Sequence, residues 1–212
     1  MTDGSNDTGK DKTDSSESDA SEDTEYEIML ATYKALSKHG YANLTMQDIA
    51  DEFSKSKSLL HYYYDTKHDL FIAYLDYLHD EFKRETEKFE EGDPVERLGS
   101  LIDILLHEPS EYEDFHLSLL ELKTQAPHDD EIRDRMVDFE LYIRQLITGI
   151  IQDGIDEGVF RDVDPNSVAV LMINAMHGAR VQEATQDMDV EPVAEAIDDY
   201  VVSQVLLDGD QE

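Results

Sequence analysis

Apolar residues recur every three or four positions from residue 26 almost to the C-terminus, and this helical period is the feature that most limits the fold. Ile28, Ala31, Ala35 and Leu36 set the first period, which ends at Gly40. No stretch combines strict apolar and polar alternation with enrichment in β-branched residues, as a strand would. The sequence therefore predicts an all-α protein.

Turn-forming residues divide this pattern into segments. Thr45 is suited to cap a short helix, and the Ser-Lys-Ser run at 54–56 interrupts it. A second short helix is expected from about Ser56 to Tyr63, and a long helix opens at Asp65 and Thr66. Further helices are expected at about 94–107, 111–125, 128–157, 166–185 and 190–207.

The chain is strongly acidic, with 51 Asp and Glu against 17 Lys and Arg and a formal net charge of -34. In molar salt the Debye length falls to roughly 3 Å, so repulsion between carboxylates is screened. We therefore predict a salt-adapted organism of the haloarchaeal type. The alternative is an acidic surface that mimics DNA or binds a basic partner.

Targeting signals and thiol chemistry are missing from the sequence. It has no Cys, its N-terminus lacks the basic and apolar run of a signal peptide, and no window approaches a membrane span. We expect a cytoplasmic protein without a membrane partner, and we predict no metal and no cofactor.

The charge is distributed unevenly between regions. Residues 1–25 carry nine acids and two lysines with almost no apolar residues, and we predict a disordered acidic tail there. Residues 26–70 carry six acids and five lysines, far closer to balance than the rest. A polyanionic partner such as double-stranded DNA is the simplest reason for this local balance.

Two short helices joined by a tight turn and packed on a longer one form a helix-turn-helix, whose second helix enters the DNA major groove. In steps of 100° per residue, that second helix has two faces. The donor-rich face, within an arc of roughly 140°, holds Lys57, Ser58, His61 and Tyr62. The opposite face holds Leu59, Leu60, Tyr63 and Tyr64.

The donor-rich face carries chemistry suited to reading DNA. Lys57 can donate to guanine, Ser58 and His61 can donate or accept, and the Tyr62 ring can cover sugar and phosphate. The alternative to DNA binding is that the lysines only form part of an ordinary solvated helix face. Two lysines outside this face are phosphate candidates, namely Lys55 in the turn and Lys67 at the start of the next helix.

The stretch "IMLATYKALSKHGYANLTMQDIADEFSKSKSLLHYYYDTKHDLF" resembles the three-helix DNA-binding module of the tetracycline-repressor (TetR) family of transcription regulators. The resemblance implies that Thr45 and Lys67 grip phosphates and that Tyr62 packs on the DNA backbone. The residues that it implies face the bases are Gln47, Lys57, Ser58, Leu59 and His61.

Behind this module the family has a helical effector-binding and dimerisation domain, which residues 71–212 would form. The stretch "GIDEGVFRDVDPNSVAVLMINAMHGAR" resembles the junction before the last two helices, through which family members pair. The resemblance thus implies three parts: the tail at 1–25, a helix-turn-helix domain at 26–70, and this domain. It also implies a homodimeric, ligand-responsive regulator, most simply a repressor, on a pseudo-palindromic operator.

The effector itself is an unidentified small molecule. Candidate contacts are Phe115, Tyr142, Met172, Met176 and His177, with Asn174 beside them, although such residues at helical spacing are more often core.

A di-iron enzyme is a remote alternative. An acid lies three residues before His at Asp65, Asp76 and Glu113, but roughly two such pairs are expected by chance in so acidic a helical chain. We predict no enzyme. An acidic helical protein-interaction module without DNA binding is the competing function.

Overall fold

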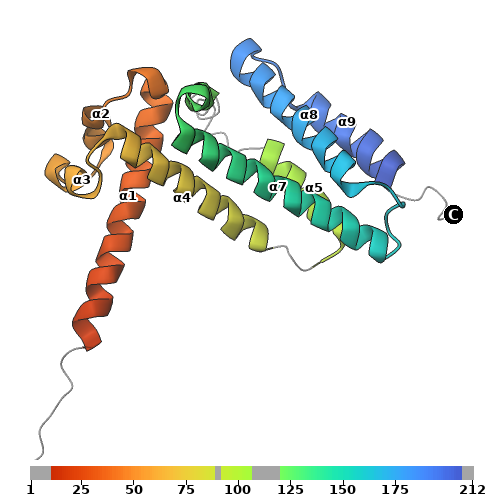
Figure 1. The fold of residues 1–212 in the computed structure, drawn as a ribbon, viewed down its shortest axis with the longest axis horizontal. Helices are drawn as coiled ribbons and strands as arrows, with labels where there is room; N and C mark the ends of the chain where they lie inside the picture. The colour runs from red at the N-terminus through yellow and green to blue at the C-terminus, as the bar shows by residue number, and fades with distance from the viewer. Residues whose placement is uncertain (1–10, 89–91, 107–119, 207–212) are drawn as a thin grey trace, which may run out of the picture.

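The computed structural model describes residues 11–88, 92–106 and 120–206, and helices make up nearly all of these ranges. No β-strand forms within them, which confirms the all-α prediction. Figure 1 shows the helices in chain order: α1 (Asp11–Asn43), α2 (Met46–Glu52), α3 (Lys57–Tyr63), α4 (Lys67–Glu87), α5 (Pro94–Leu106), the 3-10 turn η2 (Ala126–His128), α7 (Asp130–Asp156), α8 (Pro165–Gln186) and α9 (Glu191–Ala196), which continues as the π-helix η3 (Ile197–Leu206).

The first three helices and the start of α4 share one apolar core. Ile28, Ile49 and Leu60, one from each of α1, α2 and α3, are fully buried in it. This core does not end at residue 70, because Phe71 of α4 and Leu122 from the segment before η2 are also fully buried in it. The N-terminal module is therefore packed onto the C-terminal domain rather than linked loosely to it.

Local sequence sets the ends of the short helices. Thr45, Ser56 and Thr66 are N-caps, each with a side chain that accepts a hydrogen bond from the backbone N–H three residues later. Gly40 has φ 66°, and this left-handed conformation kinks α1 near its C-terminal end, ahead of α2. The predicted positions of α2, α3 and the start of α4 are thus confirmed.

The first helix begins much earlier than expected. Residues 11–25, which the composition assigned to a disordered tail, form the first turns of α1, while residues 1–10 lie outside the described residues. Near its middle, Thr24 is 6% exposed and its hydroxyl accepts a hydrogen bond from Lys55 Nζ at 2.9 Å. Packing against the turn between α2 and α3 is a tertiary contact that the local composition does not reveal.

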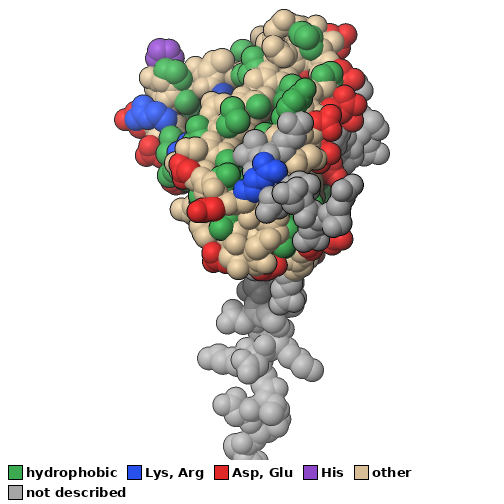
Figure 2. All heavy atoms as spheres, turned by 90° about the vertical axis from the view of Figure 1, so that its right-hand side faces the viewer, with side chains coloured by type: hydrophobic (Ala, Val, Ile, Leu, Met, Phe, Trp, Pro, Cys, Tyr) green, Lys and Arg blue, Asp and Glu red, His purple; other side chains and the backbone are tan. Residues whose placement is uncertain are grey.

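The C-terminal domain is a bundle of α5, α7, α8, α9 and η3 around a second core. At the end of α7, Gly154 lies against the buried ring of Phe160, and this corner turns the chain towards α8. Figure 2, seen from the side where the C-terminus lies, shows hydrophobic side chains with carboxylates gathered mainly towards the edges of this face.

Candidate DNA interface and ligand cavity

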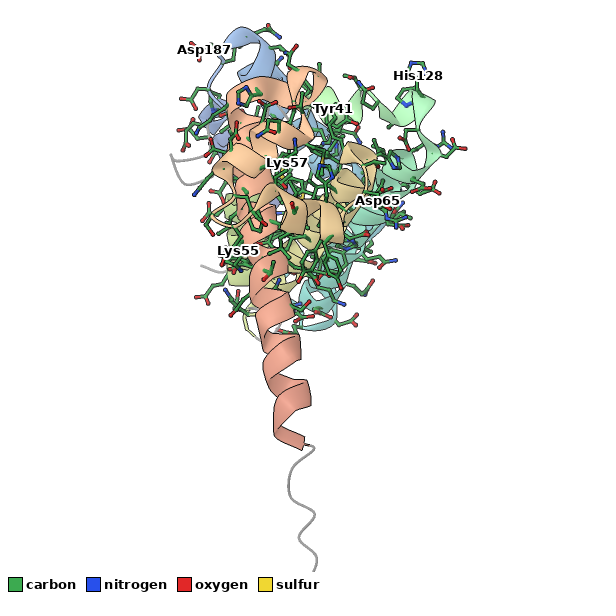
Figure 3. All side chains as sticks on the ribbon, turned by 90° about the vertical axis from the view of Figure 1, so that its left-hand side faces the viewer. Tyr41, Lys55, Lys57, Asp65, His128 and Asp187 are labelled. Atoms are coloured by element: carbon green, nitrogen blue, oxygen red, sulfur yellow. The ribbon has the colours of Figure 1, made fainter. Side chains whose placement is uncertain are left out.

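The short helix α3 has one buried and one exposed face. Leu60 is 0% exposed, whereas Tyr62 is 82% exposed and Lys57, Ser58 and His61 are also exposed. Figure 3 views the end of the molecule where Lys57 lies. A helix held by its core side with polar and aromatic groups outward is the geometry that enters a major groove.

Two of the predicted base-reading residues are already joined. Lys57 Nζ donates to Gln47 Oε1 at 2.6 Å, and Gln47 Nε2 donates to Asp51 Oδ1 at 2.6 Å. Because an ammonium group has three donors, this bond leaves Lys57 able to donate to a base while its position is fixed from α2.

Thr45 is exposed at the start of α2, but its hydroxyl is engaged in a capping box. Its Oγ1 accepts from the Asp48 N–H at 3.3 Å and lies 2.6 Å from Asp48 Oδ2. The bond from the Thr45 side chain is the main cause that lowers the pKa of Asp48. A phosphate oxygen would therefore compete with the Asp48 carboxylate for the Thr45 proton.

Both lysines assigned to phosphates have partners within the protein. Lys55 Nζ lies 3.1 Å from Glu27 Oε1, besides its bond to Thr24, and so fastens the turn to α1. Lys67 Nζ donates to the carbonyl oxygens of Tyr41 and Leu44 at 2.8 and 2.9 Å and sits 4.4 Å from the centre of the Tyr41 ring. Burial lowers the pKa of Lys67. Both lysines are thus held in place by the protein, and their role at phosphates stays a prediction.

Leu59 lies at the border between the two faces of α3. It is half-buried and packs against the N-terminal core, so only part of its side chain is open to a base. A contact with a thymine methyl group remains compatible with this position.

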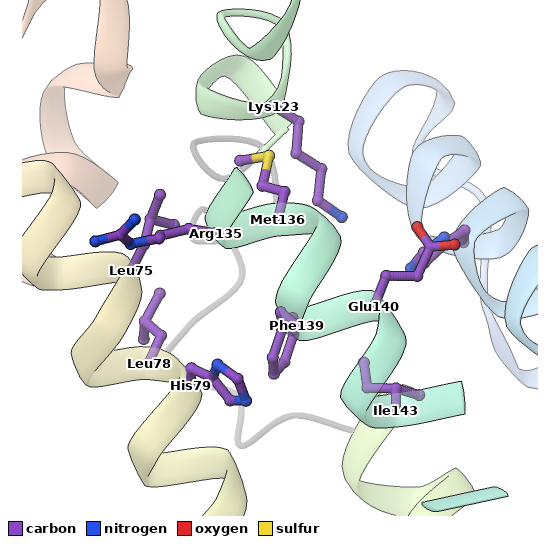
Figure 4. A pocket seen from close by; sticks show the side chains of 10 residues that line it. Leu75, Leu78, His79, Lys123, Arg135, Met136, Phe139, Glu140 and Ile143 are labelled. Atoms are coloured by element: carbon purple, nitrogen blue, oxygen red, sulfur yellow. The ribbon is translucent and has the colours of Figure 1, made fainter. Parts of the chain in front are cut away.

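A cavity of about 320 Å³ lies in the C-terminal domain, between α4, α7, α8 and the helical residues 120–123. Its size is within the range of small-molecule sites. Figure 4 shows side chains from α4 and α7 on two sides of it and the Lys123 side chain reaching into the space between α7 and α8. The lining residues are Leu75, Leu78, His79, Lys123, Arg135, Met136, Phe139, Glu140, Ile143 and His177.

A second hollow of about 250 Å³ adjoins the first, because both are lined by Lys123, Phe139, Ile143 and His177. Arg180 of α8 also lines it. The Arg180 Nη1 atom lies 2.7 Å from Glu183 Oε2, and its Nε donates to the Leu105 carbonyl at 3.3 Å.

Burial at the cavity lowers two pKa values. Burial lowers the pKa of Lys123, although much of this residue is open to solvent, because its ammonium end is the part that lies by the cavity. Burial, and then the charge of Lys123, lower the pKa of His177, which is therefore neutral at pH 7.

The predicted effector contacts fall in different places. His177 lines both hollows, whereas Met172 and Met176 are 0% and 4% exposed in the core. Tyr142 lies beside the cavity, with its hydroxyl 3.0 Å from Thr86 Oγ1. Phe115 lies outside the described residues.

Asn174 is exposed on α8, where its side-chain N–H donates to the Val170 carbonyl at 2.8 Å.

Lys123 and Glu140 line the cavity but were not predicted from the sequence. The sequence does distinguish Lys123, because it is a lone base in an acidic stretch. His79 was noticed only for its spacing from Asp76.

Neither a metal-binding cluster nor a membrane-spanning helix is present in the described part of the chain. Over residues 11–88, 92–106 and 120–206, no His, Asp and Glu residues cluster in threes as a metal site requires. In the same ranges no helix has the length and apolar character needed to span a membrane.

Two protein-family models match the chain, one over the N-terminal module and one over the C-terminal domain. Residues 28–74 match the model of bacterial regulatory proteins of the tetR family, and residues 94–206 match that of the C-terminal domain of BetI-type transcriptional repressors. No curated protein matches the chain.

Solved structures of transcription regulators are also similar to this chain. A TetR transcription regulator from Haloarcula marismortui is 42% identical, with a TM-score of 0.81 over 87% of this chain and 99% of that one. A putative regulator from Saccharomonospora viridis in complex with choline is 24% identical (TM-score 0.77; 88% and 100% covered), and FadR from Bacillus subtilis in complex with stearoyl-CoA is 17% identical (TM-score 0.68; 85% and 98% covered). These last two show the fold alone. The chain belongs to the TetR family of DNA-binding transcription regulators.

Proposed function

We propose that this protein is a homodimeric, ligand-responsive repressor that binds a pseudo-palindromic operator through α3. The observation that carries the proposal is the exposed face of α3, on which Lys57, Ser58, His61 and Tyr62 project while Leu60 anchors the helix. Gln47 adds a side chain from α2 to the same surface. The positively charged Lys55 and Lys67 contribute to phosphate attraction from fixed positions rather than as free arms.

Dimerisation is proposed through α8 and the α9–η3 helix. Leu171 is 61% exposed and Tyr200 is 64% exposed, and apolar groups of this size in so acidic a surface favour a partner. An identical partner related by a two-fold axis would place two copies of α3 on two half-sites.

The effector would act through residues 120–123, which contact both domains. Lys123 lines the cavity and Leu122 is buried in the N-terminal core. Glu121 Oε2 accepts a weak hydrogen bond from the Ala42 N–H at 3.4 Å, next to the bend at Gly40. A ligand that displaces Lys123 would thus bias the position of the helix-turn-helix, and repression would be relieved if it favours a spacing that two half-sites do not fit.

The family relatives are transcription regulators, so we assign no catalytic activity and infer a cytoplasmic location, where the DNA is. The likeness to the Haloarcula protein supports the salt-adapted origin inferred from composition. At molar salt, phosphate neutralisation contributes little affinity, so we expect binding to rely on shape, base-edge hydrogen bonds and apolar contact.

The test is fluorescence anisotropy with the DNA upstream of the protein's own gene, in molar KCl. We expect specific binding that Lys57→Ala plus His61→Ala abolishes, while the matched control Lys83→Ala plus His128→Ala retains it. The slope of log affinity against log salt should be well short of about -6. Absence of specific binding would instead favour an acidic protein-interaction module, and a slope of about -6 would contradict the shallow salt dependence.

A further inference from the structure

We propose that the effector is an amphipathic organic acid, whose apolar body fills the cavity and whose carboxylate is held by Lys123 and Arg180. This assignment rests on the ligand-responsive function proposed above. The two solved neighbours with named ligands hold molecules of opposite charge, choline and stearoyl-CoA, so the fold does not decide the charge of the ligand. The charge of the ligand is decided instead by the side chains that line the cavity in this protein.

Lys123 is a cation that faces the cavity and forms no ion pair with any side chain in the described part of the chain. Among the residues that the structure describes, no hydrogen bond or ion pair reaches its ammonium group, although the Glu140 charge acts on it at longer range. Partial desolvation of a charge is unfavourable unless a partner compensates it. A ligand carboxylate beside Lys Nζ would supply that partner.

Arg180 offers a second donor on the same side. Its Nε and Nη1 bind Leu105 and Glu183, but its Nη2 is buried and has no hydrogen-bond partner among the residues that the structure describes. A buried donor without a partner is unfavourable by about 1–3 kcal/mol, which a ligand oxygen would offset. Because Arg180 and Lys123 line the same hollow, one anionic group in it can be approached from both.

The other charges at the cavity are already neutralised. Arg135 Nε donates to Asp76 Oδ1 at 2.9 Å, and Glu140 Oε1 lies 3.3 Å from Arg144 Nη2. His177 is neutral, as shown above. The uncompensated charge is therefore positive, in a part of the chain where residues 71–212 carry 36 acids and ten bases.

Among the residues at 11–88, 92–106 and 120–206, the aromatic groups near the cavity do not form a cage for a cation. The rings of His79, Phe82, Phe139 and Tyr142 pack against one another, with centroids 5.1–6.2 Å apart for the four closest pairs. A trimethylammonium group needs ring faces that surround an open space. These rings form an apolar wall instead, which suits a hydrocarbon body.

The experiment uses three probes with the same eight-carbon body: octanoate, octyltrimethylammonium and 1-octanol. Binding to the full-length protein is measured by isothermal titration calorimetry in molar KCl, where exposed charges are screened but partly buried ones are screened less. We expect octanoate to bind at least about tenfold more tightly than either other probe, as a charge-assisted hydrogen bond implies.

Variants assign the preference to residues. Lys123→Met and Arg180→Met should each reduce octanoate affinity about tenfold and leave 1-octanol affinity unchanged, whereas the exposed Lys83→Met should change neither. Retention of the preference in Lys123→Met would overturn the assignment to this residue even if Arg180→Met proves unstable.

A DNA-release assay separates the two proposals. If octyltrimethylammonium binds more tightly and releases the protein from its operator, the ligand response stands and the acidic effector is wrong. If 1-octanol binds as tightly as octanoate, or if none of the probes binds, the acidic effector is also wrong, whereas operator binding is tested independently of all three.

Discussion

The corner between α7 and α8 allows a sharp test of the packing of the C-terminal core. A Cβ atom on Gly154 would lie 2.1 Å from Cδ2 and 2.5 Å from Cε2 of the Phe160 ring, distances that real Cβ atoms do not show. The ring is 4% exposed, so it cannot swing out cheaply. The backbone is also held, because the Gly154 carbonyl accepts the N–H groups of Val159 and Phe160 at 2.8 and 2.9 Å.

Gly154→Ala should therefore destabilise the fold despite the better helix propensity of alanine. Overpacking of this kind destabilises by about 1–3 kcal/mol. For a chain of this length, a loss of about 2 kcal/mol lowers the Tm by about 4–8 °C. Because the proposed dimer makes stability depend on concentration, the comparison requires one protein concentration throughout.

Gly149, in the same helix, is the matched control. It is exposed, and no atom lies within 4 Å of its added Cβ, so Gly149→Ala should stabilise by about 0.4–1 kcal/mol. Urea unfolding in molar KCl measures both variants, and Phe160→Leu should relieve part of the effect of Gly154→Ala. Equal or same-sign changes for the two glycines would refute the close contact with Phe160.

Two further predictions concern single side chains. Lys67→Met should lower the free energy of unfolding by roughly 1–3 kcal/mol, because it leaves the Tyr41 and Leu44 carbonyls without their donor; unchanged stability in urea would show that Lys67 serves DNA alone. His177 has a pKa lowered from its ordinary 6.5 by burial, so below pH 6.5 the unfolded chain binds a proton that the folded chain resists. Stability should thus be lost as the pH falls below 6.5, less steeply in His177→Gln, and an identical pH profile for that variant would contradict this.

The parts of the fold that the sequence predicted depend on periodicity. Leu60 and Tyr62 fall on opposite sides of α3 in steps of 100° per residue, and in the structure Leu60 is buried and Tyr62 is exposed. The helix starts at Thr45 and Thr66 also depend on local sequence, since a capping side chain accepts a hydrogen bond from a backbone N–H only three residues later.

What the sequence did not reveal depends on contacts between distant residues. Lys55 has two partners on α1, and one of them, Thr24, lies in a stretch whose composition predicted disorder. Met172 and Met176 have the spacing of cavity residues and of core residues alike, and only the packing of α8 decides that they are core. The cavity itself brings Lys123 and His177 together from segments that no local pattern connects.

The proposed salt-adapted origin would account for where the positive charges lie. On an exposed DNA-binding face, each added lysine gains little at molar salt, because the release of counter-ions no longer contributes much. A partly buried cation is screened far less by the same salt. An acidic, salt-adapted regulator would therefore keep its few bases where protein shields them, as at Lys67 beneath the Tyr41 ring and at Lys123 by the cavity. On this reasoning, added salt should weaken the contact of Lys57 with DNA more than the contact of Lys123 with the carboxylate of the proposed organic-acid ligand.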